Sequence, residues 1–176
     1  MKKNLFLLLI PVLLIFSACS KKSDDTTGNA GTVNTWTFTE GSKVFSGQLL
    51  IDASLNPTLQ SNNSYTFGMI GFENTSGFVF NIVLSLLDLN FTAKTYQSGI
   101  NGNDYLNAFY YSESVASIDN VYKSSNLDPG PAMTYTITAY DAAKDIVTIT
   151  FSGQAQLANG SFINITKGKV TAKIER

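Results

Sequence analysis

The side chains that can carry chemistry in this chain are few, and their types already limit what it can do. The 176 residues include no histidine and one cysteine, Cys19. Without histidine there is no Ser-His-Asp triad, no Cys-His dyad and no histidine-ligated metal centre. A single cysteine excludes an internal disulfide and a four-cysteine zinc or iron–sulfur site. The remaining reactive groups are carboxylates, hydroxyls, amines and tyrosines.

Carboxylates are the groups with which a histidine-free hydrolase can work, as a general acid paired with a base or nucleophile. Most Asp and Glu residues here fall in expected turns or at strand ends, where they are ordinary surface residues. Glu73 and Glu113 are the pair to inspect because each ends an expected strand, although nothing in the sequence brings them together. We therefore predict no catalytic residue and no enzymatic activity, with a carboxylate-dependent hydrolase as an alternative.

Two loops offer oxygen atoms to a hard cation such as calcium. They are Asn101-Gly102-Asn103-Asp104 and the segment from Asp141 to Asp145. Neither completes a known calcium-loop pattern, and Asn, Gly and Asp are also the common residues of turns. We predict no metal site and no cofactor.

Tyrosines gather in residues 89–133, a stretch rich in Asn, Ser and Asp that interrupts the regular strand spacing. Aromatic faces stack on sugar rings, and nearby amides and carboxylates can bond sugar hydroxyls. The predicted ligand-contacting residues are Asp104, Tyr105, Tyr110 and Tyr122. In the alternative interpretation, Phe109 and Tyr111 face the core as alternate residues of a strand, with Tyr110 outside.

Cys19 follows a segment that predicts export. Lys2 and Lys3 precede an apolar run, residues 5–16. As a helix this run would span roughly 18 Å at the usual rise per residue, against about 30 Å of hydrocarbon core in a bilayer. Its length and its basic start are therefore typical of a signal peptide, residues 1–18, rather than of a transmembrane helix.

Phe16-Ser17-Ala18-Cys19 resembles the lipobox of bacterial lipoproteins, with Phe16 where the commonest pattern has Leu. In having an aromatic residue at that position, the segment resembles the signal sequences of Bacteroidota-type lipoproteins. The resemblance implies cleavage before Cys19, its acylation (palmitate among the chains) and attachment to the outer membrane, at the periplasmic face or the cell surface. Two or three acyl chains make such attachment practically permanent, whereas one is marginal. An ordinary signal peptide with an unrelated cysteine is the alternative.

Residues 19–35 are predicted to be a flexible linker between the lipid and the domain. They hold a single sizeable apolar side chain, Val33, and cannot build a core. Lys21-Lys22-Ser23-Asp24-Asp25 is similar to a lysine-plus-acidic tract that directs some Bacteroidota lipoproteins to the cell surface. A solvated charged linker explains the same residues.

Residues 36–176 are predicted to form one all-β domain, an antiparallel β-sandwich or partly open barrel with little helix. Trp36 and Phe38 alternate with threonines, so both are expected to face the core. In a later strand the expected inward-facing residues are Tyr135, Ile137 and Ala139. The inward parity of the last strand changes near Gly168, which predicts a β-bulge there.

The domain resembles small Bacteroidota lipoproteins of unknown function. The features that carry the resemblance are Thr35-Trp36-Thr37-Phe38 with its following hairpin, Lys94-Thr95-Tyr96, and a closing part made of residues 147–153, Asn159-Gly160 and Asn164-Ile165-Thr166-Lys167-Gly168-Lys169-Val170. The family implies a lipid-anchored β domain and transfers no activity or site residue. With a net charge of −1, the chain lacks the excess of basic residues that is typical of nucleic-acid-binding proteins. We expect a membrane-attached, non-catalytic binding or structural protein whose partner is a glycan or an envelope protein, with a glycan-binding surface lipoprotein as the alternative.

Overall fold

The computed structural model describes residues 32–51, 55–60, 63–97, 106–113, 120–125 and 132–176. The predicted signal peptide, Cys19 and most of the predicted linker lie outside these residues, and the folded unit comprises Gly31–Arg176. Every regular element in the described part is a β-strand, so the all-β prediction is confirmed. The strands are β1 (Thr35–Glu40), β2 (Lys43–Leu49), β3 (Thr58–Leu59), β4 (Tyr65–Glu73), β5 (Val79–Leu86), β6 (Thr95–Gln97), β7 (Ala108–Ser112), β8 (Asn120–Ser125), β9 (Met133–Asp141), β10 (Ile146–Leu157) and β11 (Phe162–Lys173).

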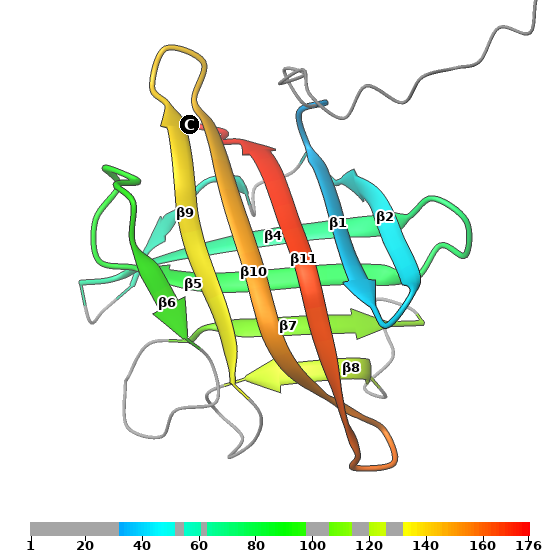
Figure 1. Cartoon of the computed structure of the whole chain (residues 1–176). Coiled ribbons are helices and arrows are strands. Elements are labelled where there is room, and N and C mark those ends of the chain that lie inside the picture. Colours follow the sequence, from blue (N-terminus) through cyan, green and yellow to red (C-terminus); the bar gives the residue numbers. More distant parts are fainter. Residues whose placement is uncertain (1–31, 52–54, 61–62, 98–105, 114–119, 126–131) are drawn as a thin grey trace, which may run out of the picture. The chain divides into compact units, whose positions relative to one another are not determined.

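Eight of these strands close into an antiparallel barrel, in the order β1-β2-β4-β5-β7-β8-β10-β11. Strand β10 closes the ring because it is long enough to have different neighbours along one edge. Its first part pairs with β9, and Gln156 and Leu157 near its end pair with β8. Strands β9 and β6 extend the sheet beyond β10, and β3 pairs with β4. In Figure 1, β9, β10, β11 and β1 lie in front of β4, β5, β7 and β8 and run across them.

The first hairpin follows directly from its local sequence. Trp36 and Phe38 alternate with threonines, whose β-branched side chains suit a pleated strand. The chain turns at Gly41 and returns as β2, with Phe38 opposite Phe45. Trp36 and Phe38 are 2% and 0% exposed, so their predicted inward orientation is confirmed.

Aromatic rings fill the inside of the barrel, and Phe38 lies at the centre of them. Four phenylalanine rings have centroids between 4.6 and 6.5 Å from that of Phe38. They belong to four other strands and are Phe45 (β2), Phe80 (β5), Phe109 (β7) and Phe151 (β10). Because these rings come from both layers, their burial joins the front and back of the barrel and removes a large apolar area from water.

A bulge in β11 changes which side chains face inward. Between the same register positions, β11 has one residue more than β10 and one more than β1. The parity change predicted near Gly168 is therefore confirmed, with Ile165 and Val170 both buried. The left-handed backbone conformation belongs to the preceding residue, Lys167, with a φ of 52°. Gly168 itself lacks room for a Cβ, which would meet the carbonyl and the ring of Phe151.

A second irregularity, in β9, corrects one expectation. Tyr135 and Ile137 are buried as predicted, whereas Ala139 is exposed. Ala139 pairs with Thr148 and Ile137 pairs with Ile149, so β9 holds one extra residue at this point. The extra residue reverses the alternation and turns Ala139 outward.

Candidate functional site

The predicted tyrosine site divides between two faces of the sheet. Asp104 and Tyr105 lie outside the described residues. Tyr122 is 8% exposed, and its ring stacks on that of Tyr111 with centroids 5.6 Å apart. Tyr110 precedes Tyr111 in β7 and is opposite Lys123, so its side chain points to the other face. Phe109 and Tyr111 are buried while Tyr110 is half-buried, which confirms the alternative interpretation of this strand.

Tyr122 belongs to a polar cluster at one end of the barrel. We define the tyrosine–glutamate cluster as Glu40, Glu73, Tyr111 and Tyr122. Glu40 ends β1 and Glu73 ends β4. The Tyr122 hydroxyl donates to Oε2 of Glu40 at 3.4 Å, and the Ser76 hydroxyl donates to Oε2 of Glu73. The two carboxylates therefore meet the two stacked rings from different strands.

Burial and nearby negative charge both raise the pKa values of Tyr111 and Tyr122. Burial raises the pKa of Tyr111 above its usual value, and the charge of Glu73 adds to the rise. Burial also raises the pKa of Tyr122 to about 12, with further contributions from Glu40 and then Glu73. The neutral phenol is favoured because removal of its proton would place a second negative charge beside a carboxylate in a poorly solvated position.

At neutral pH the cluster therefore presents two hydroxyl donors to two glutamate side chains. A general acid or base is most effective when its pKa lies near the working pH, and these tyrosines hold their protons far above it. Beneath them lies Phe45, whose ring centroid is 5.3 Å from that of Tyr111 and 4.3 Å from Nζ of Lys43. Phe45 and the two tyrosine rings thus pack together as one aromatic group next to the glutamates.

Glu73 and Glu113, the two glutamates singled out from the sequence, lie at the ends of strands that are not neighbours. Val79 of β5 pairs with Phe72 on one side and with Ser112 on the other. The ends of β4 and β7, which lead to the two glutamates, thus lie on opposite sides of β5. The sequence analysis missed the contact between Glu40 and Tyr122, because 82 residues separate them and no local pattern joins them.

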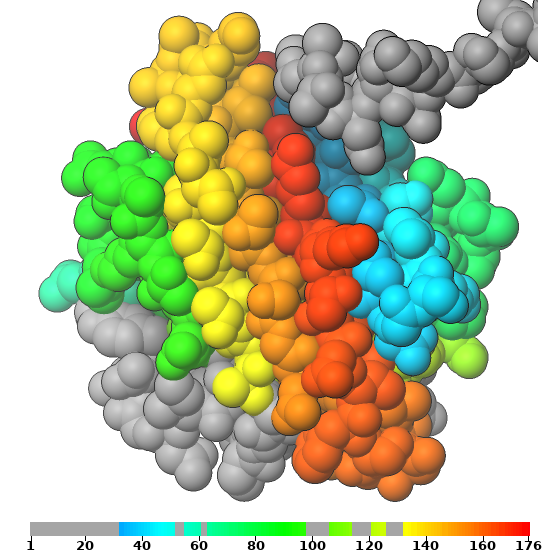
Figure 2. Space-filling model, in the orientation of Figure 1, coloured from blue at the N-terminus to red at the C-terminus, as the bar shows by residue number. Residues whose placement is uncertain are grey.

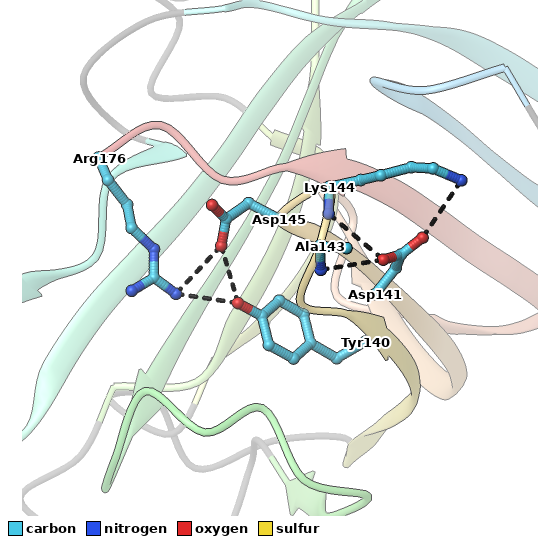
Figure 3. Close-up of polar contacts among 6 residues, drawn as sticks. All are labelled: Tyr140, Asp141, Ala143, Lys144, Asp145 and Arg176. Carbon is cyan, nitrogen blue, oxygen red and sulfur yellow. Dashed lines mark hydrogen bonds and ion pairs between the residues drawn. The ribbon is translucent and has the colours of Figure 1, made fainter.

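The segment from Asp141 to Asp145 forms the β9–β10 hairpin turn, and its carboxylates hold that turn (Figure 3). Oδ1 of Asp141 accepts from the backbone N–H groups of Ala143 and Lys144 at 3.1 and 3.3 Å, which is common turn chemistry. Oδ1 of Asp145 accepts from the Tyr140 hydroxyl at 2.8 Å. The role of these groups is therefore to fix the turn.

Asp145 also links the residues that follow β11 to this hairpin. Nη2 of Arg176 lies 3.2 Å from Oδ1 of Asp145 and donates to the Tyr140 hydroxyl at 2.9 Å. The hydrogen bond to Asp145 raises the pKa of Tyr140. Across the described residues, no group of three or more Asp, Glu, Cys or His side chains is arranged to hold a metal ion.

Two further findings bear on how this chain relates to other proteins and to membranes. No family model, curated protein or solved structure matches it. In the part of the chain that the structure describes, no helix has the length and apolar character needed to cross a membrane.

Proposed function

We propose that this chain is a lipid-anchored cell-envelope protein whose β domain serves binding or structure rather than catalysis. The observation that carries the proposal is the position of the only cysteine, Cys19, directly after Phe16-Ser17-Ala18 and an apolar run. A lipid on Cys19 would hold the protein at the outer membrane, on the periplasmic face or the cell surface.

The packing of the domain supports a binding or structural role in which the outer surface of the barrel makes the contacts. Phe38 and the rings around it occupy the centre of the barrel, so ligand contacts are expected on outward-facing residues. The tyrosines of the tyrosine–glutamate cluster retain their protons at neutral pH, which suits hydrogen bonding more than proton transfer.

The test of the anchor is fractionation of cells that produce the parent chain or the Cys19→Ala variant. We expect the parent in the membrane pellet until detergent is added, with acyl label incorporated at Cys19. The Cys19→Ala variant should carry no acyl label and should lose the parent's detergent dependence, because two or three acyl chains are needed for stable attachment. Ser23→Ala, in the same predicted linker, is the matched control and should behave as the parent.

A Cys19→Ala variant that stays as detergent-dependent as the parent and still takes up label would contradict the proposal. Protease treatment of intact cells then separates the two proposed locations. Degradation of the domain in intact cells indicates the cell surface, and degradation only after the outer membrane is opened indicates the periplasmic face.

A glycan-binding surface lipoprotein is the second candidate. It is favoured by the number of hydroxyl side chains that the strands of the front layer direct outward. Thr150 is exposed, and Thr37 and Thr136 are half-buried, with their neighbours in the same strands facing the core. Hydroxyl groups both donate and accept, as sugar hydroxyls require.

A further inference from the structure

Six polar residues form one continuous line across the outer face of the sheet, one from each of six neighbouring strands. Each is the direct register partner of the next. In order they are Ser46 (β2), Thr37 (β1), Lys169 (β11), Thr150 (β10), Thr136 (β9) and Thr95 (β6). We call these six residues the Lys169 line. Five strand spacings of about 4.8 Å give it a length of about 24 Å.

A second line runs beside it, two residues further along each strand. Its residues are Gln48 (β2), Thr35 (β1), Thr171 (β11) and Thr148 (β10). Figure 2 views this face, where β9, β10, β11, β1 and β2 together make one continuous surface. Hydroxyl and amide groups thus repeat in two directions over the face, and Thr171 is the most buried of these residues, at 8% exposed.

Two shallow grooves flank Lys169 on this face, and both include it. One, of about 370 Å³, also contains Thr37, Ser46 and Gln48. The other, of about 400 Å³, also contains Lys167, Thr136 and Thr150. Because Lys169 is common to both, the grooves adjoin and follow the Lys169 line to either side of its ammonium group.

The two lines differ from the rest of the domain in holding no acidic side chain. The ten residues of the two lines include no carboxylate, and their one charged side chain is Lys169. Lys167 lines the groove next to it. The chain nevertheless has more acidic than basic residues. Glu40 and Glu73 lie at one end of the barrel. Asp141 and Asp145 lie in the β9–β10 hairpin, where they pair with Lys144 and Arg176.

We propose that this face binds an anionic polysaccharide, with Lys169 at the centre of the track. The inference rests on the binding role proposed above and adds its surface and ligand class. The ammonium groups of Lys169 and Lys167 pair with carboxylate or sulfate groups of the polymer. The threonine, serine and glutamine side chains exchange hydrogen bonds with its hydroxyls. A track of about 24 Å that continues on both sides of the lysine fits a linear polymer better than a single sugar.

The same residues disfavour other classes of partner. The two lines contain no aromatic side chain. The two aromatic residues that line the grooves, Trp36 and Phe151, are 2% and 3% exposed, so neutral sugars and nucleic-acid bases have no open aromatic face on which to stack. A protein interface has an apolar centre, whereas the centre of this face is a lysine among threonines. An anionic membrane is held by clusters of basic residues that each contribute about 1 kcal/mol, and only Lys167 and Lys169 line these grooves.

The test measures binding of the purified full-length protein, in detergent, to immobilised polygalacturonate, dextran sulfate and neutral dextran. We expect binding to at least one of the two anionic polymers, little binding to neutral dextran, and weakening with added salt. Lys169→Gln should weaken the binding about tenfold, as expected when one charge-assisted hydrogen bond is lost. Thr150→Val, which keeps the shape of the side chain and removes its hydroxyl, should weaken it about threefold.

Lys144→Gln is the matched control, since it removes the same charge from an exposed position in the β9–β10 hairpin. Its affinity should stay within about twofold of the parent, and thermal melting should show that all variants are folded. Failure of the parent to bind either anionic polymer would overturn the proposal, as would equal losses in Lys169→Gln and Lys144→Gln.

Vesicles of phosphatidylglycerol and an oligothymidylate are the competing probes. If either binds as tightly as the polysaccharide, with the same dependence on Lys169, the polysaccharide assignment is wrong. These measurements use detergent-solubilised protein, so their failure leaves the anchor at Cys19 untouched. Equally, failure of the Cys19→Ala test leaves the polysaccharide result standing.

Discussion

The inner and outer faces of the same strands differ sharply in what they contribute. In β1, Trp36 and Phe38 are almost completely buried, while Thr35 and Thr37 between and beside them face outward. Strand β10 repeats the arrangement, with Ile149 and Phe151 inside. One alternation of apolar and polar residues along each strand therefore produces both the core and the outer surface. The inner surface supplies most of the apolar burial that stabilises the domain, and the outer surface offers chemistry without being needed for folding.

The largest expected effect comes from removing the central ring. Phe38→Ala should lower the free energy of unfolding by about 3–5 kcal/mol, since it leaves a cavity among four other phenylalanines. Thr150→Ala, on the outer face of β10, should change it by about 0.5 kcal/mol. Chemical denaturation of both variants measures the two effects. Similar losses in the two variants would break the comparison between inner and outer faces.

A smaller effect should follow from the buried hydroxyl of Tyr122. The pKa of Tyr122 rises to about 12 in the folded protein, against about 10 when the chain is unfolded. Below pH 10 both states hold the proton and the contribution of this group to stability is fully present. As pH rises from about 10 towards 12, the unfolded state releases its proton first, so the free energy of unfolding falls.

Tyr122→Phe has no proton to release at this position, so its stability should fall less over the same pH range. Denaturation at a series of pH values tests this, and the difference from the parent at neutral pH isolates the loss of the bond to Glu40. The pKa of Tyr111 is also raised, so the stability of the Tyr122→Phe variant should still fall somewhat at alkaline pH. Parallel curves for the parent and Tyr122→Phe would show that this hydroxyl does not behave as a buried group.

The smallest expected effect concerns the outer contact between Arg176 and the β9–β10 hairpin. The side chains of Arg176 and Asp145 are 52% and 37% exposed, so solvent and salt weaken their attraction. Arg176→Ala should lower the free energy of unfolding by less than about 1 kcal/mol, and added salt should reduce the difference from the parent. A loss comparable to that of Phe38→Ala would show that this surface contact holds the fold.

Local alternation was enough to predict much of the domain. The inward faces of Trp36 and Phe38, the core positions of Phe109 and Tyr111, and the parity change near Gly168 are as expected. Ala139 was placed on the wrong face because an extra residue in β9 shifts the register, and nothing in the alternating sequence marks that residue. A bulge without a glycine leaves little local signal.

The candidate sites were less predictable than the fold. Tyr122 is a predicted ligand contact, and in the structure its ring stacks on Tyr111 and its hydroxyl donates to Glu40. The outward threonines of the Lys169 line were visible as alternate residues in separate strands. Their alignment with Lys169 depends on the pairing of β11 with both β1 and β10. No local sequence pattern indicates which distant strands will pair.

Local sequence patterns were sufficient for most of the strands outside residues 89–133, for the buried face of most of them, and for the single cysteine at residue 19, whose surroundings resemble a lipobox. These features are local, because a side chain's alternation and its immediate neighbours decide them. Only the tertiary structure decided the strand order, the closure of the barrel through Leu157 and Tyr122, and the meeting of Glu40 with the tyrosines. Each of these depends on which distant strands pair and in what register. Packing of the whole domain makes that choice, because a slip of one residue would turn the buried face of a strand outward.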